Sequence, residues 1–444
     1  MRDLADIIKR YHVVIASINR VDYAPIVPAE GRGPIIRDIT GREYIDLSAS
    51  AAVMTLGYAH PRIIEAAGEA LRRITHSTHM YGYVPETLEL AEELARITPV
   101  DRPKVSFGLS GNDANEGALL LAKAYTGKEV FIAYENSFHG VGAAAASVSG
   151  IGLEREVVAK IGPWARTVFV PYPNCYRSPY PNNPGKCVKH YLEPLKEALD
   201  EVGDEAAALV LEPIQGDGGI IVPPDDYFPA VFKLVRDRGA IVIDDEVQTC
   251  VGRTGRWYAI EHHGLRPDVV AVGKGLGGGL PISAIIGREG IMESLPPLAY
   301  TFTLAGNPVT AAAALAVIRE VEEKGLVKRA AELGERALQY LRGVQRRHNL
   351  VGDVRGRGLM IGVELVKDKE TKKRAVEETK KVVWRAHELG LIVLFVAGNV
   401  LRIQPPLNID WSTLEEGLAR LEQAIEDVEE GRVGDEALKH VQGW

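Results

Sequence analysis

Cysteine is scarce in this sequence, which has only Cys175, Cys187 and Cys250 among 444 residues. Three cysteines cannot build a disulfide framework, and their spacing does not match that of a metal site. We therefore expect all three to be small, partly buried hydrophobic side chains. We also expect the protein to have no metal centre.

The chain also lacks an excess of positive charge and any apolar stretch long enough for a membrane span. Acidic residues outnumber basic ones, 60 to 52, and no run of five or more basic residues occurs. This balance argues against a protein that binds nucleic acid through phosphate contacts. Residues 1–20 carry charges at both ends of a short apolar segment, which predicts an amphipathic helix and not a signal peptide. We expect a soluble, cytoplasmic protein without nucleic-acid or membrane partners.

The middle of the chain alternates between two patterns. Between about 60 and 330, helical periodicity alternates with the short apolar runs KEVFIAY, AAALVLEP, GAIVIDDE and DVVAVGK. Strands that are apolar on both faces and separated by helices are typical of a parallel sheet covered on both sides. The sequence therefore predicts an α/β fold with a large, mainly parallel sheet.

The two ends of the chain differ from its middle. Residues 35–47 predict two short strands around a turn at Thr40-Gly41. The tail has long charged helices and two strand-like runs, which indicates a smaller α+β domain formed with the N-terminal segment. We place the N-terminal segment at 1–60, the large domain at 61–325 and the C-terminal part of the small domain at 326–444.

Polar residues follow the predicted strands, and ligands of open parallel sheets bind at the carboxyl ends of strands. Residues 110–116 place a glycine and small polar side chains at a helix start, which fits either an anion site or a helix cap with an incidental glycine. Residues 136–140 contain an aromatic side chain beside a histidine, a pair that fits packing unless a ring-shaped ligand lies nearby. Asp245 and Glu246 should point to opposite sides, so that one can serve a ligand and the other the structure.

Lys274 is unusual because glycines enclose it at the end of a buried strand. Burial lowers the pKa of a lysine and makes its amine nucleophilic. A reactive lysine, a carboxylate after a neighbouring strand, an aromatic ring and a phosphate-binding helix start together fit pyridoxal 5′-phosphate.

At this point the sequence resembles the class III pyridoxal-phosphate aminotransferases, which have the type I aminotransferase fold. The resemblance extends from about Arg32 to Leu407, and its most specific part is IVIDDEVQTCVGRTG followed by PDVVAVGKGLGGGLP. It implies that Lys274 and Asp245 are catalytic, with Lys274 forming the Schiff base and Asp245 binding the pyridinium nitrogen. It implies further cofactor contacts from Gly111, Asn112, Phe138, His139, Glu212, Val247, Gln248 and Thr303, with Thr303 reaching the phosphate of a partner subunit. It also implies that Arg402 grips a substrate carboxylate.

Two positions depart from the family's pattern in ways that bear on the substrate and the reaction. Val141 stands where many ω-amino-acid aminotransferases have an arginine, so 4-aminobutyrate is a less attractive substrate than an aliphatic amino acid. Asp217 stands where the family commonly has glutamate, and an aspartate at this position resembles the amino-acid racemases and epimerases on this fold. Asp217 is either a conservative replacement that pairs with Arg402 or a second acid/base opposite Lys274.

The favoured hypothesis is an aminotransferase that moves an amino group from an amino donor to a 2-oxo acid acceptor. The alternative is an amino-acid racemase or epimerase that uses Lys274 and Asp217 as opposed acid/bases. A binding protein with a vestigial site has little support, because Lys274 and Asp245 are both present. The resemblance also implies a homodimer or a dimer of dimers.

Overall fold

The computed structural model describes residues 4–443, and the chain divides into two compact units. The larger unit is Pro61–Lys328. The smaller unit combines the segment that ends at His60 with the segment that begins at Arg329. Across residues 4–443, no helix combines the length and the apolarity that crossing a membrane requires.

The larger unit is built on a seven-stranded sheet with the order β4-β10-β9-β8-β7-β5-β6. Its strands are β4 (Pro103–Gly108), β5 (Val130–Tyr134), β6 (Arg166–Val170), β7 (Ala206–Leu211), β8 (Ile241–Asp245), β9 (Val269–Val272) and β10 (Ser283–Arg288). β10 is antiparallel to both of its neighbours, and the pairs from β9 to β6 are parallel. Every residue of β5, β7, β8 and β9 is buried, which explains why these runs are apolar on both faces.

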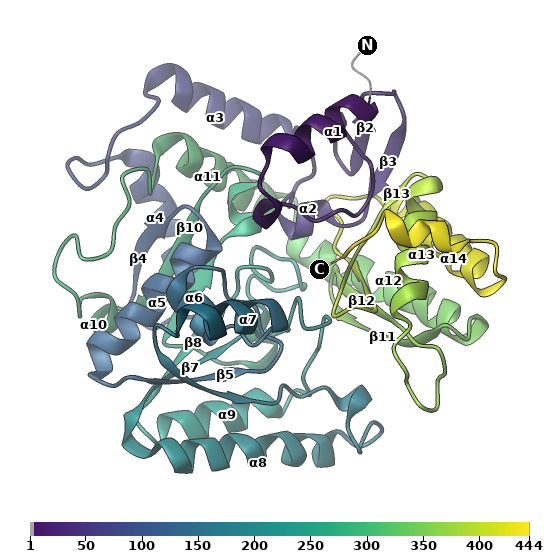
Figure 1. The fold of residues 1–444 in the computed structure, drawn as a ribbon. Helices are drawn as coiled ribbons and strands as arrows, with labels where there is room; N and C mark the ends of the chain where they lie inside the picture. The colour runs from purple at the N-terminus through teal and green to yellow at the C-terminus, as the bar shows by residue number, and fades with distance from the viewer. Residues whose placement is uncertain (1–3, 444) are drawn as a thin grey trace. The chain divides into compact units, whose positions relative to one another are not determined.

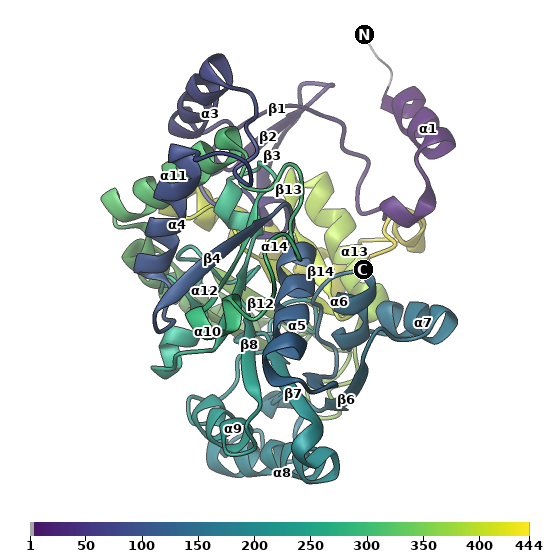
Figure 2. The ribbon, with the colours of Figure 1, turned by 90° about the vertical axis from the view of Figure 1, so that its left-hand side faces the viewer.

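Helices cover both faces of this sheet (Figure 1). α5 (Gly111–Thr126) and α6 (Ala143–Val148) lie on one side, and α8 (Pro184–Val202) and α9 (Tyr227–Arg236) lie on the other. Figure 2 shows a third group beside β4, formed by α3 (Pro61–Arg73), α4 (Pro85–Ile97) and α11 (Pro308–Glu323). The remaining helical elements are α7 (Gly152–Ile161), α10 (Glu289–Met292), η2 (Cys175–Arg177), η3 (Gly203–Glu205), η4 (Ala259–His263) and η5 (Lys274–Gly277).

The smaller unit contains two four-stranded sheets, with the orders β1-β2-β3-β13 and β11-β12-β15-β14. The strands are β1 (Pro28–Arg32), β2 (Ile35–Asp38), β3 (Glu43–Asp46), β11 (Val351–Arg357), β12 (Met360–Leu365), β13 (Leu391–Ile392), β14 (Leu394–Val396) and β15 (Val400–Ile403). β13 pairs in parallel with β3, and the Ile45 amide donates to the Gly390 carbonyl at 3.0 Å. The two terminal segments therefore share a sheet, and the predicted fold class is confirmed.

Helices complete the smaller unit. They are α1 (Leu4–Val14), η1 (Ser17–Asn19), α12 (Leu326–Arg347), α13 (Val376–Glu388), α14 (Trp411–Glu429) and η6 (Asp435–Lys439). The short segment α2 (Ala49–Ala52) has positive φ at all four residues. The expected N-terminal helix is present as α1, and the expected strand pair around Gly41 is β2 and β3.

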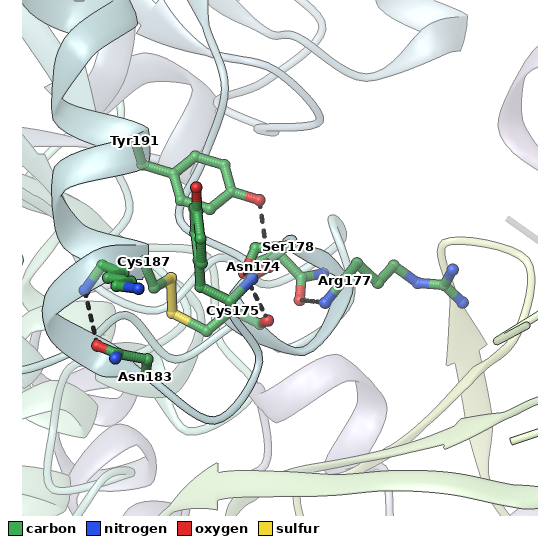
Figure 3. Close-up of a disulfide and its surroundings, with 9 residues drawn as sticks. Asn174, Cys175, Arg177, Ser178, Asn183, Cys187 and Tyr191 are labelled. Atoms are coloured by element: carbon green, nitrogen blue, oxygen red, sulfur yellow. Dashed lines mark hydrogen bonds between the residues drawn. A yellow bond between two sulfur atoms is a disulfide. The ribbon is translucent and has the colours of Figure 1, made fainter. Parts of the chain in front are cut away.

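The prediction for the cysteines is wrong for two of the three. Cys175 and Cys187 form a disulfide with their Cα atoms 5.7 Å apart, whereas Cys250 is free and buried, as expected. The bond joins η2 to the first turn of α8, where the Cys187 amide donates to the Asn183 carbonyl at 2.9 Å (Figure 3). The intervening loop folds back on itself, and a spacing of 12 residues does not reveal how close two Cα atoms lie.

We expect reduction of this disulfide to lower the free energy of unfolding by about 3 kcal/mol, because the bond restricts the unfolded chain around a short loop. Urea unfolding with and without dithiothreitol measures the effect. The double variant Cys175→Ser/Cys187→Ser should match the reduced protein and should not respond to dithiothreitol. If dithiothreitol destabilised this variant as much as the wild type, the effect would come from Cys250 or from the reagent and not from the disulfide.

Candidate active site

The larger unit contains a cavity of about 210 Å³ at the carboxyl ends of its parallel strands. Asp245 ends β8, and Lys274 follows β9 by two residues. The lining residues are Gly111, Asn112, Asn115, Phe138, His139, Gly140, Val141, Glu212, Ile214, Asp217, Asp245, Val247, Gln248, Thr249 and Lys274. The structure therefore brings together eleven of the thirteen site residues that the sequence predicts.

The other two predicted residues, Thr303 and Arg402, do not line this cavity. Thr303 is exposed in the turn that precedes α11, and its expected reach into a partner subunit stays a prediction. Arg402 lies buried in β15 of the smaller unit, and its contact with a substrate carboxylate also stays a prediction.

Three hydrogen bonds fix the carboxylate of Asp245. Its Oδ2 accepts from Asn115 Nδ2 at 2.7 Å and from His139 Nδ1 at 2.8 Å, and its Oδ1 accepts from the Val247 amide at 3.0 Å. The neighbouring Glu246 serves the structure instead, because its carboxylate accepts from the amides of Ala259 and Ile260 at the start of η4. One carboxylate faces the cavity and the other supports the fold, as expected.

Asn115 has a role that the sequence prediction missed. Besides its bond to Asp245, its Nδ2 donates to the His139 carbonyl at 2.8 Å, so it links α5 to the loop after β5. The signal was present, because Asn115 follows Gly111 by four residues, and side chains at that spacing share one face of a helix.

The start of α5 is both capped and open to the cavity. The Ser110 side chain accepts from the Asp113 amide, and Asp113 Oδ2 accepts from the Ser110 amide at 3.0 Å, which forms a capping box. The glycine is not incidental, since a Cβ at Gly111 would lie 2.5 Å from Val247 Cγ1. Asn112 Oδ1 accepts from the Gly142 amide at 2.7 Å and so holds the loop that contains Val141.

Lys274 has an uncommon backbone conformation. Its φ of +39° lies in the left-handed region, which few residues other than glycine adopt. Backbone strain of this kind is frequent at functional sites, where the surrounding structure imposes it. At Lys274 the chain turns from β9 into η5, and this turn places the lysine at the cavity.

Glu212 connects two loops that reach the cavity. Its Oε1 accepts from the Phe138 amide at 3.1 Å and its Oε2 from the Gly216 amide at 2.8 Å. Burial raises the pKa of Glu212 to about 7. Glu212 therefore couples the position of the Phe138 ring to the hairpin that contains Asp217.

The hairpin around Asp217 is tightly held. Gln215 and Ile221 exchange two backbone hydrogen bonds of 3.1 and 3.0 Å, and Gln215 Nε2 donates to the Glu135 carbonyl at 2.8 Å. Asp217 itself is 8% exposed and lines the cavity. The carboxyl group of Asp217 is thus presented to the cavity from a short, well-anchored turn.

Asp244 precedes the cavity residue Asp245 and is completely buried. Burial raises the pKa of Asp244 well above its ordinary value of 3.8, and the charges of Glu246 and Asp245 raise it further. Above about pH 4 the folded protein then holds a proton on Asp244 that the unfolded chain has lost. The free energy of unfolding therefore falls as the pH rises, by up to about 1.4 kcal/mol per pH unit for one such group.

We expect Asp244→Asn to flatten this pH dependence, because asparagine does not titrate. The variant should lose less stability than the wild type between about pH 5 and pH 8 in urea unfolding. Asp226→Asn, at an exposed position, serves as the matched control and should follow the wild-type curve. Parallel curves for the wild type and Asp244→Asn would contradict the prediction.

Comparisons with known proteins agree with this geometry. The family model described as Aminotransferase class-III matches residues 17–425. The chain is 52% identical to the leucine/methionine racemase of Thermococcus litoralis over 99% of each chain. It is 40% identical to the isoleucine 2-epimerase of Lentilactobacillus buchneri over 93% of each chain. It resembles the solved structure of an omega transaminase from Pseudomonas jessenii in complex with PMP, with a TM-score of 0.86 and 29% identity over 92% of this chain and 93% of that one.

Proposed function

This chain belongs to the class III aminotransferase family and is a pyridoxal-phosphate-dependent enzyme, and from that premise we propose that it racemises or epimerises amino acids with apolar side chains. The leucine/methionine racemase and the isoleucine 2-epimerase support this choice, since both names describe inversion at the α-carbon of such amino acids. The sequence alone favours transamination, and these relatives favour the alternative.

The cavity fits the cofactor. It brings an amine from Lys274 and a carboxylate from Asp245 together with the Phe138 ring and the start of α5. Two polar atoms at this site, His139 Nε2 and Asn115 Oδ1, are buried without a hydrogen-bond partner among the described residues. Bound here, pyridoxal phosphate supplies an electron-accepting ring that makes the α-hydrogen of an attached amino acid acidic.

Each group on the cavity has a task in this proposal. Lys274 binds the cofactor covalently, and Asp245 holds the proton on its ring nitrogen. Phe138 and Val247 pack against the ring, Gln248 binds its phenolic oxygen, and the start of α5 binds its phosphate.

Among the titratable groups that line this cavity, Lys274 and Asp217 come from different segments of the chain, and this observation carries the proposal. Lys274 comes from the turn after β9, whereas Asp217 comes from the hairpin after β7. Inversion requires one group to remove the α-hydrogen and another to return a proton to the opposite face. We assign these tasks to the Nζ of Lys274 and the carboxyl of Asp217.

The substrate class follows from the apolar part of the lining. Val141 and Ile214 line the cavity and offer no charge to a second substrate carboxylate. Each methylene buried against such groups contributes about 0.8 kcal/mol, whereas a desolvated, unpaired carboxylate is costly. We therefore assign aliphatic amino acids as substrates, with Arg402 binding their α-carboxylate.

Transamination remains the second candidate, because Lys274 and Asp245 suffice for it and the family description names it. Incubation of the holoenzyme with L-leucine, with and without 2-oxoglutarate, followed by chiral analysis, separates the two functions. D-leucine formed without an oxo acid supports racemisation. Loss of leucine that requires the oxo acid, without D-leucine, would reject the proposal in favour of transamination.

A further inference from the structure

Val141 lines the cavity although most of its side chain is open to solvent. The side chain is 67% exposed, and both residues that flank it, Gly140 and Gly142, are glycines. A residue this exposed is not held in place by packing against the core, and glycine allows the backbone more conformations than any other residue. Other contacts must therefore fix the position of Val141 if it is to act as a wall of the cavity.

Two side chains of α5, one helical turn apart, supply these contacts. Asn112 Oδ1 accepts from the Gly142 amide at 2.7 Å. Glu116 Oε1 accepts from the amides of Ala144 and Ala145 at 2.9 and 3.3 Å. Residues four apart lie on the same face of a helix, and α5 and α6 are neighbours in the larger unit (Figure 1). Both side chains therefore hold the segment that runs from Gly142 into the first turn of α6.

The glycines on either side of Val141 allow the backbone to approach these two side chains closely. A Cβ at Gly140 would lie 2.5 Å from Asn112 Oδ1, and a Cβ at Gly142 would overlap Glu116 Oε1. Gly140 also has a φ of +133°, which residues with a side chain rarely adopt. The backbone on both sides of Val141 thus lies directly against α5.

We propose that Glu116 is a positioning residue that sets the preference for the substrate side chain by holding Val141 in place. This inference rests on the proposed function, because it takes the aliphatic side chain of the substrate to lie against Val141. Glu116 itself does not line the cavity, whereas Asn112 does. Loss of the Glu116 carboxylate releases two amides at the start of α6 and lets Val141 move, while the other lining residues stay unchanged. Leucine then loses a contact on which alanine, with only a methyl group, depends less.

The first test compares Glu116→Ala with the wild-type holoenzyme on L-leucine and L-alanine. The lost contact binds the side chain equally at every stage of the reaction, so the KM for leucine should rise by about tenfold with kcat unchanged. The KM for alanine should change by less than about twofold. Glu116→Gln should restore the wild-type values, because the glutamine Oε1 still accepts from both amides. Glu129→Ala, at an exposed position after α5, should behave as wild type.

A double variant tests whether Glu116 acts through Val141. Val141→Ala removes the wall itself and should lower the preference for leucine over alanine by a similar factor. Glu116→Ala added to Val141→Ala should lower this preference no further, because the two substitutions remove the same contact. Additive effects of the two substitutions would mean that Glu116 acts elsewhere, and would overturn the inference.

Two further measurements do not depend on turnover. Amide hydrogen exchange of the peptide that contains Ala144 and Ala145 should be faster in Glu116→Ala than in the wild type, with no change in β5. Titration of the visible absorbance of the holoenzyme with leucine and with alanine should give dissociation constants that follow the KM values. Unchanged amide exchange would overturn the inference, and an equal loss of affinity for both amino acids would indicate a merely structural role and overturn it as well.

The titration also separates this inference from the proposed function. If the wild type binds leucine but forms no D-leucine, the proposed function fails, and the titration alone decides the role of Glu116. A wild type that binds no leucine would overturn both.

Discussion

Replacement of Lys274 by alanine is expected to abolish turnover, with kcat/KM for leucine lower by at least about 10⁴-fold. Lys274 both attaches the cofactor and moves the α-hydrogen, and general acid–base catalysis alone accounts for about 10² to 10⁴ in rate. The fold should survive, because alanine adopts the strained φ of +39° no less readily than lysine does. The other residues that line the cavity are unchanged.

Two measurements check this result together. Borohydride reduction followed by mass spectrometry should place the cofactor on the Lys274 peptide in the wild type and on no peptide in Lys274→Ala. Lys189→Ala, at an exposed position, should retain full activity. A Lys274→Ala enzyme that turns over within tenfold of the wild type would refute the assignment, whatever its cofactor content.

Residues at strand ends were predictable because their chemistry depends on local sequence. Asp245 and Lys274 each follow a short run that is buried on both faces, and the carboxyl ends of parallel strands meet at one edge of a sheet. Val141 lies two residues after His139, in the segment that follows β5, so it could be assigned to the same cavity from its position after a strand. The pattern of apolar runs thus predicted both the sheet and the main groups of the cavity.

Features that depend on contacts between distant segments were not predictable in this way. Cys175 and Cys187 form a disulfide because the loop between them folds back. The spacing of apolar residues along the sequence does not predict the path of such a loop. Glu154 sits in a sequence whose apolar residues would be expected to face the core, yet α7 buries the carboxyl group instead. The antiparallel strand β10 likewise follows a glycine-rich stretch that gives no sign of chain direction.

Replacement of Asp217 by asparagine is expected to lower the rate of leucine racemisation by about 10³-fold while Lys274 continues to act on its own face. Asparagine keeps the size and hydrogen-bonding ability of the side chain but cannot accept or donate a proton in turnover. The hairpin should remain in place, because Gln215, Ile221 and Glu212 hold it through their own hydrogen bonds.

Deuterium distinguishes the two faces of the substrate. In D₂O the Asp217→Asn enzyme should incorporate deuterium at the α-carbon of one enantiomer of leucine without inverting it, whereas the wild type should incorporate deuterium and invert. If Asp217 only pairs with a cation, the substitution should raise KM and leave kcat nearly unchanged, and Asp226→Asn should change neither. Racemisation by Asp217→Asn within threefold of the wild-type rate would mean that Lys274 serves both faces, and a loss of exchange as well as inversion would mean that Asp217 supports the site and not the proton transfer.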